Sequence, residues 1–255
     1  MISKMKKLFA VVSIVFIYAS AAHAAHPLIT DDTGTQGKRN FQLELNSEFS
    51  HEDEDGASEN VFEFASILSY GLTDSVDVVL GVPYQFIRLK EDGQKDSENG
   101  LSDISLELKW RFYEKDGLSL ALKPGITLPT GDDDKGLGAG KATYSAFFIT
   151  TKEIAPWAFH LNLGYIRNEN HADERKDLWH ASLAAAYSIT EKLTVVGNIG
   201  IERNTDRIVN THPAFILGGL IYSISENLDL DFGIKGGLNE PEADYSLLAG
   251  LAWRF

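Results

Sequence analysis

Apolar and polar residues alternate with a period of two along most of the chain, and this pattern restricts the possible folds more than any other feature. The clearest stretch covers residues 101–113, and the alternation returns in residues 40–50, 157–166, 228–236 and 245–255. Successive side chains of a β-strand point to opposite faces of its sheet, so the pattern predicts a series of strands with one apolar face each.

The predicted strands are joined by connections that alternate strictly in length. Short turns fall at residues 71–74, 114–117, 152–156, 189–192 and 224–227. Long polar loops fall at residues 51–60, 90–100, 129–140, 167–176, 204–211 and 238–244. Six long loops and five short turns join twelve strands and leave both termini on the short-turn side. We therefore expect an all-β fold, a closed antiparallel transmembrane β-barrel of about 12 strands with short periplasmic turns and long outer loops.

Aromatic residues on the apolar faces gather near the short-turn ends of the strands. They are Tyr70, Trp110, Phe112, Trp157, Tyr187, Tyr222, Trp253 and Phe255. Amphipathic rings prefer the boundary between membrane and water, so this distribution predicts one aromatic girdle. The rival architecture is a β-propeller, because the short turns recur at nearly the spacing of propeller blades. Each period here holds two long strands rather than four short ones, which favours the barrel.

The N-terminus has the pattern of a secretory signal. Three lysines precede a short apolar run, and Ala22-His23-Ala24 matches an A-x-A cleavage site. A membrane anchor is the alternative, but the apolar run is too short to favour it. We expect residues 1–24 to be removed, residues 25–39 to form a periplasmic N-terminal segment, and residues 40–255 to form the barrel. An export signal ahead of a transmembrane barrel predicts that the protein is located in the outer membrane of a Gram-negative bacterium.

Composition excludes several classes of function. The net charge of −14 argues against nucleic-acid binding, which requires a basic face. The absence of cysteine excludes disulfides, thiolate metal sites and cysteine nucleophiles. No catalytic motif is complete: the glycine-rich run at residues 136–141 departs from a phosphate loop, and Asp132–Asp134 lacks the acid that closes a calcium loop. We therefore expect no enzyme, no cofactor and no metal site.

The inward faces of the strands carry the function if the barrel prediction holds. Charged residues expected to face the lumen are Glu44, Glu48, Glu63, Asp77, Asp103, Glu107, Lys109, Arg111, Lys123, Asp229, Asp231, Lys235 and Arg254. His160 and His180 join them as polar lumen residues rather than as metal ligands. Charges inside a barrel are either paired or hydrated. The lumen is therefore either a water-filled pore whose charges set selectivity or a space filled by ion pairs, and both alternatives stay open.

The chain ends on Phe255, the last of a series of alternating apolar residues. A terminal aromatic residue resembles the recognition signal for outer-membrane barrel assembly. We therefore expect the barrel-assembly machinery as one partner, and outer-membrane lipid with lipopolysaccharide as another. The acidic long loops are either a solvated surface or a contact with anionic head groups bridged by divalent cations.

Several segments resemble one family of bacterial outer-membrane proteins. The matching segments are residues 26–37, 70–78, 100–112, 128–133 and 136–141, of which 100–112 and 128–133 are the most specific. The family carries the description "putative MetA-pathway of phenol degradation". The resemblance implies an outer-membrane barrel associated with the breakdown of aromatic compounds, and it implies no catalytic residue.

These observations predict a channel or transporter for passive passage of small molecules, with hydrophobic or aromatic compounds as the expected class. The alternative is a non-conducting structural barrel that works through its acidic outer loops. A membrane enzyme that modifies lipids is a third reading, and it is the weakest because no nucleophile–base pair stands out in the sequence.

Overall fold

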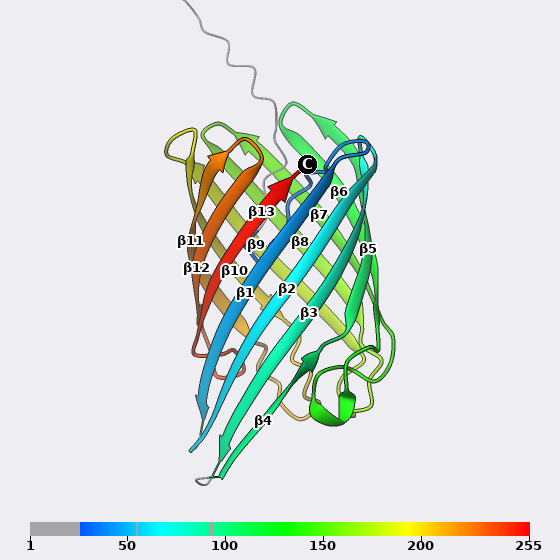
Figure 1. Ribbon diagram of the computed structural model, residues 1–255, viewed down its shortest axis with the longest axis vertical. Helices are drawn as coiled ribbons and strands as arrows, with labels where there is room; N and C mark the ends of the chain where they lie inside the picture. Colours follow the sequence, from blue (N-terminus) through cyan, green and yellow to red (C-terminus); the bar gives the residue numbers. More distant parts are fainter. Residues whose placement is uncertain (1–25, 55, 92–93) are drawn as a thin grey trace, which may run out of the picture.

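The computed structural model describes residues 26–54, 56–91 and 94–255, which form a single antiparallel sheet closed into a barrel (Figure 1). The strands are β1 (Phe41–Glu54), β2 (Ala57–Thr73), β3 (Val76–Glu91), β4 (Gln94–Leu101), β5 (Ile104–Lys115), β6 (Leu118–Leu128), β7 (Thr143–Ile154), β8 (Trp157–Arg167), β9 (Asp177–Ser188), β10 (Leu193–Glu202), β11 (Ala214–Ser225), β12 (Leu228–Gly237) and β13 (Tyr245–Arg254). A short 3₁₀ turn, η1 (Asp133–Lys135), is the only helical element among the described residues. None of the helices in these ranges is long and apolar enough to cross a membrane.

Twelve strands make the barrel wall, and β4 is an extra strand. Neighbours in the chain are neighbours in the wall, except that β3 pairs with both β4 and β5. The first and last strands close the ring, with a register that runs from Gln42 opposite Arg254 to His51 opposite Tyr245. The predicted fold class, a closed antiparallel barrel with short turns at one end and long connections at the other, is therefore confirmed.

Two segments predicted as long loops are strands. Residues 51–54 and 57–60 continue the β1–β2 hairpin, residues 90–91 end β3, and residues 94–100 form most of β4. Figure 1 shows these hairpins reaching past the long-loop end of the barrel, at the bottom of the view. These strands have polar residues on both faces, so they do not show the alternation of polar and apolar residues that identifies the other strands. Extended backbone groups that leave the wall still find partners by continuing the antiparallel ladder.

The alternation of side chains follows the predicted pattern in the wall. In β5, Leu106, Leu108 and Trp110 are 43%, 39% and 47% exposed on the outside, while the residues between them are less exposed. Most of the predicted girdle is also exposed on the outer surface near the short-turn end, as for Trp157 and Trp253. An apolar outer band of this kind is what a barrel presents to lipid.

The inner face also carries an apolar cluster that the alternation did not predict. Phe215, Leu217 and Leu248 are buried in a cluster on the inside, and Leu28 packs against them. Runs such as Phe215-Ile216-Leu217 break the period of two, because both faces are apolar there. The apolar inner patch lies where the chain ahead of β1 contacts the wall.

Candidate functional site in the barrel lumen

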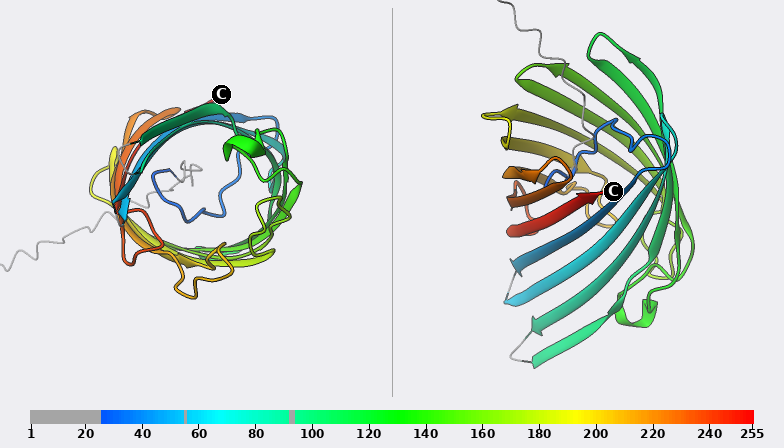
Figure 2. Two further views of the ribbon diagram at one scale, coloured as in Figure 1. Left: turned by 90° about the horizontal axis from the view of Figure 1, so that it is seen from below. Right: turned by 45° about the horizontal axis from the view of Figure 1, so that its top comes forward.

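Residues 26–37, predicted to lie in the periplasm, instead lie inside the barrel (Figure 2, left). The backbone amides of Ile29 and Thr30 donate to Asn198 Oδ1 at 2.8 and 3.0 Å. Asp31 exchanges two hydrogen bonds with the Asn162 side chain, at 2.8 and 2.7 Å. The segment is held inside because its backbone groups find polar side chains of the wall in place of water. We call residues 26–37 the inner segment.

The inner segment leaves the barrel at the short-turn end. The Gln36 amide donates to Asp77 Oδ2 at 2.9 Å, and the Arg39 amide donates to the Gly71 carbonyl at 2.8 Å. Gly71 has no side chain, and a Cβ there would collide with the Gly37 carbonyl. Gly37 itself has a φ of 77°, which favours glycine. The two glycines let the segment turn closely over the edge of β2.

Glycines in the wall also make room for the start of the inner segment. A Cβ on Gly233 would lie 2.8 Å from Pro27 Cβ, and one on Gly219 would lie 2.7 Å from Pro27 Cγ. A Cβ on Gly250 would lie 2.5 Å from His26 Nδ1. Three adjacent strands, β11 to β13, therefore leave out side chains where the segment passes.

An ion-pair network joins the inner segment to the opposite wall. Lys109 Nζ lies 2.8 Å from Asp31 Oδ1 and 3.9 Å from Asp32 Oδ1. Lys123 Nζ lies 3.0 Å from Asp31 Oδ2 and 3.4 Å from Glu107 Oε2. Burial opposes ionisation of Asp31, but the two ammonium groups outweigh it and hold the pKa of its carboxyl below the usual range. Asp31 is therefore the charge that connects both lysines.

Most of the remaining predicted lumen charges are also paired. The pairs are Asp229 with Arg254 at 2.6 Å, Lys235 with Glu48 at 3.1 Å and with Glu242 at 3.0 Å, Arg111 with Glu114 at 3.2 Å, and Asp231 with His26. Glu63 accepts a hydrogen bond from Gln85 at 2.7 Å, and Glu44 accepts one from Gln42 at 2.7 Å. Asp103 has a different role, because its two oxygens accept the amides of Gly131 and Ala139 and so fold the loop after β6.

The two predicted histidines are buried and bond to neighbours in the wall. His160 Nδ1 lies 2.9 Å from Thr151 Oγ1. His180 Nε2 lies 2.9 Å from Ser182 Oγ, and its Nδ1 lies 3.4 Å from Glu202 Oε2. Ser182 is 3% exposed, and Thr30 of the inner segment donates to its Oγ at 2.7 Å. The described residues contain no group of three or more His, Asp or Glu side chains that could hold a metal ion.

A cavity of about 280 Å³ lies between the inner segment and the wall formed by β1, β2, β3, β5 and β6. Its charged lining consists of Asp31, Asp32, Glu44, Asp77, Glu107, Lys109 and Lys123. Its apolar lining consists of Leu28, Ile29, Ile67 and Val79. We call this space the lumen cavity. It combines surplus carboxylates with aliphatic walls.

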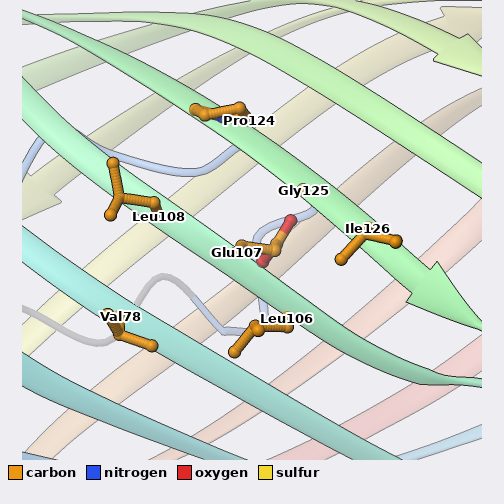
Figure 3. Close-up of a pocket in the computed structure, with 7 residues that line it drawn as sticks. All are labelled: Val78, Leu106, Glu107, Leu108, Pro124, Gly125 and Ile126. Carbon is orange, nitrogen blue, oxygen red and sulfur yellow. The ribbon is translucent and has the colours of Figure 1, made fainter.

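A shallow, open hollow of about 300 Å³ lies where the wall pairing between β5 and β6 is interrupted (Figure 3). The register between these strands includes Glu107 opposite Gly125 and Trp110 opposite Leu122, but no pair between them. Pro124 occupies the gap, and proline has no amide hydrogen to donate to the ladder. Figure 3 shows Glu107 lying between the two strands beside Gly125, with aliphatic side chains around it.

Sequence reasoning considered the charged inward residues and missed the uncharged groups that hold the inner segment. Asn162, Ser182 and Asn198 are all almost fully buried, and all contact the segment. Their positions on the inward faces are readable from the alternation. What the alternation does not reveal is that a segment from outside the strands would meet them.

Comparisons with known proteins agree with the barrel. The model of the family described as "Putative MetA-pathway of phenol degradation" matches residues 28–255. The COG4313 outer membrane channel from Pseudomonas putida F1 is similar in structure, with a TM-score of 0.68, 16% identity, and coverage of 88% of this chain and 98% of that chain. No curated protein matches the chain in sequence.

Two further solved structures share the fold at lower similarity. The KdgM porin in complex with disordered oligogalacturonate has a TM-score of 0.57 and 8% identity, and covers 84% of this chain and 99% of its own. The translocator domain of the autotransporter NalP from Neisseria meningitidis has a TM-score of 0.54 and 11% identity, with coverage of 90% and 91%. These similarities concern the fold alone.

Proposed function

The chain belongs to the family described as "Putative MetA-pathway of phenol degradation", and on that premise we propose that it is an outer-membrane channel for passive passage of small molecules. The observation that carries the proposal is a lumen that is only partly filled. Side chains alone fill a barrel of about eight strands. Here twelve strands enclose an inner segment of the chain and still leave the lumen cavity beside it.

The expected cargo is a small hydrophobic or aromatic compound. Support comes from the family description, which names phenol degradation, and from the aliphatic walls of the lumen cavity at Leu28, Ile29, Ile67 and Val79. The similar structure from Pseudomonas putida F1 is titled an outer membrane channel, and KdgM is titled a porin. In such a channel the short turns would face the periplasm and the long connections the outside.

Cross-linking the inner segment to the wall by a reversible disulfide tests the proposal. Thr30 Oγ1 and Ser182 Oγ lie 2.7 Å apart, and the chain has no cysteine of its own. The double variant Thr30→Cys with Ser182→Cys should form a disulfide that fixes the inner segment to β9. Conductance in planar bilayers should be low in the oxidised protein and rise after reduction. Each single cysteine variant, treated with the same oxidant and reductant, is the control.

The outcomes separate the alternatives. Equal conductance before and after reduction would mean that passage does not require the inner segment to move. If the fully folded protein conducts in neither state, the channel hypothesis is wrong and the non-conducting structural barrel is the better explanation. The proposal therefore depends on current through the reduced barrel.

A lipid hydrolase is the second candidate, because Ser182, His180 and Glu202 have the order of hydrogen bonds found in a catalytic triad. Against it, Ser182 lines neither the lumen cavity nor the hollow between β5 and β6, and Thr30 covers its hydroxyl. A fluorophosphonate probe should not label the purified protein. Labelling that disappears in Ser182→Ala would favour the hydrolase.

A further inference from the structure

The lumen cavity contains more negative than positive charge. Five carboxylates line it, namely Asp31, Asp32, Glu44, Asp77 and Glu107, against the ammonium groups of Lys109 and Lys123. Both lysines already have partners, since each lies at 3.0 Å or less from Asp31. Charges inside a protein require a counter-charge or strong hydrogen bonds. The cavity therefore has carboxylates that its own lysines do not balance.

Glu44 and Asp77 are the carboxylates without a cationic partner at ion-pair distance among the described residues. Glu44 accepts hydrogen bonds from the amide side chains of Gln42, at 2.7 Å, and Asn46, at 3.4 Å. Asp77 accepts the backbone amide of Gln36 on one oxygen only. Neutral donors satisfy part of the hydrogen-bonding capacity of Glu44 and Asp77, and no cation in the described ranges is in direct contact with either carboxyl group.

Two buried acceptor atoms in the same lining have no hydrogen-bond partner within the described part of the chain. They are Asp77 Oδ1 and Asn46 Oδ1, on side chains that are 1% and 9% exposed. Buried acceptors are nearly always satisfied in folded proteins, because leaving one unpaired is unfavourable. A carboxylate oxygen and an amide oxygen both accept hydrogen bonds, so a group that donates hydrogen bonds or carries positive charge complements them.

We propose that the lumen cavity binds a small primary ammonium compound with an apolar body, whose ammonium group donates to Asp77 Oδ1. Three N–H donors on one cation match an unpaired carboxylate oxygen, and the aliphatic side chains of Ile67 and Val79 face the rest of the ligand. A metal ion fits less well, since the described residues offer no group of three or more His, Asp or Glu ligands. The inference deepens the proposed function by naming a cargo class, and it rests on that function only in treating the ligand as cargo.

Binding to the purified full chain in detergent tests the proposal. The probe is 2-phenylethylammonium, and 2-phenylethanol and phenylacetate are its neutral and anionic counterparts. Isothermal titration should show the ammonium compound binding roughly tenfold or more tightly than the alcohol, as expected when a buried acceptor gains or loses its donor. Phenylacetate should not bind.

Two isosteric variants locate the site. Asp77→Asn removes the charge but still accepts the Gln36 amide, so the fold should persist while affinity for 2-phenylethylammonium falls by about tenfold. Glu63→Gln is the matched control, because Glu63 is also an inward carboxylate, is hydrogen-bonded to Gln85 and does not line the cavity. Its affinity should equal that of the unmodified chain.

Three results would overturn the inference. These are equal affinities for the ammonium compound and the alcohol, unchanged binding in Asp77→Asn, or displacement of the probe by millimolar Ca²⁺ with Ca²⁺ binding alone. Failure of the channel is a separate result. A barrel that binds 2-phenylethylammonium but passes no current would support the binding site and contradict the proposed channel. A barrel that conducts but does not bind 2-phenylethylammonium would support the channel and contradict the binding site.

Discussion

Asp31 is the single residue on which the position of the inner segment most depends. Its two carboxylate oxygens meet two different lysines, Lys109 and Lys123, which come from neighbouring strands β5 and β6. The adjacent Asp32 makes one longer ion pair, at 3.9 Å from Lys109, and accepts the backbone amide of Gly34. Two acids next to each other in sequence therefore differ in their contribution to the same network.

Replacing Asp31 by Asn should destabilise the protein because it removes the shortest ion pairs of two lumen lysines and leaves only the longer contacts of Lys109 with Asp32 and of Lys123 with Glu107. The free energy of unfolding should fall by about 3–5 kcal/mol, the usual cost of breaking a buried ion pair from one side. Reversal potentials under a salt gradient should shift away from cation selectivity, since the change removes one negative charge beside Lys109 and Lys123. Chemical unfolding measures the first effect, and Asp32→Asn, with an expected loss below about 1 kcal/mol, is the control. A larger loss in Asp32→Asn than in Asp31→Asn would contradict the assignment.

Phe255 has a structural role besides the predicted assembly signal. Its backbone amide and carbonyl pair with Phe41, and the two rings stack with centroids 5.5 Å apart. Phe255→Ala keeps these backbone hydrogen bonds, so it tests the ring alone. The folded amount in the outer membrane should fall much further than in Phe49→Ala, whose ring lies 6.4 Å from that of Tyr245. Equal amounts of the two folded variants on a heat-modifiability gel would contradict the hypothesis that Phe255 is an assembly signal.

At the scale of elements, the strands of the wall were predictable and the chain outside the wall was not. Alternation identifies β5 or β12 because lipid on one side and a polar lumen on the other impose a period of two. The end of β1, the start of β2, the last residues of β3 and most of β4 are mainly polar on both faces, so nothing in their sequence separates them from loops. The inner segment shows no regular alternation of polar and apolar residues. It belongs to no sheet or helix, and single hydrogen bonds to several strands hold it in place. Its partners in the wall were readable, but their meeting depends on the closed ring.

The gap in the ladder between β5 and β6 leads to a prediction about Pro124. In Pro124→Val the new amide can donate to β5, so the missing pairs opposite Leu108 and Lys109 should form. Hydrogen exchange followed by mass spectrometry should show slower exchange in peptides that cover this part of β5 and β6. Leu122→Val is the matched control, because its pairing with Trp110 is already present, and it should leave exchange unchanged. If the amide introduced by Pro124→Val exchanges at the rate of a loop amide, the gap has another cause.

The whole molecule consists of a closed wall and a segment that fills part of its interior. Every strand of the wall is paired on both sides by other wall strands, including the closure of β1 on β13. None of these ladders includes the inner segment, whose backbone amides donate to side chains of the wall instead. The wall should therefore fold to the same barrel when the segment is displaced.

Gly233→Ala tests this separation. The added Cβ would lie 2.8 Å from Pro27, so the start of the inner segment should shift and the conductance in planar bilayers should rise. The heat-modifiable band should be unchanged, because the nearest wall atom, the Gly218 carbonyl oxygen, is at 3.7 Å. Gly218→Ala, whose Cβ would meet open space, is the control and should match the unmodified protein in both measurements. Loss of the band in Gly233→Ala alone would mean that the wall needs the segment in order to close.

The location of the inner segment also decides where a label can be attached. A tag or fluorophore placed directly ahead of His26 would emerge within the ring of strands, next to Gly250, and would compete with cargo for the same space. One placed after Phe255 would lie beside the place where the first and last strands of the wall, β1 and β13, meet. The loop between β10 and β11 offers a better place, since Ile208 is 88% exposed there. An epitope inserted at Ile208 would report surface display in intact cells without touching either the junction of β1 and β13 or the passage.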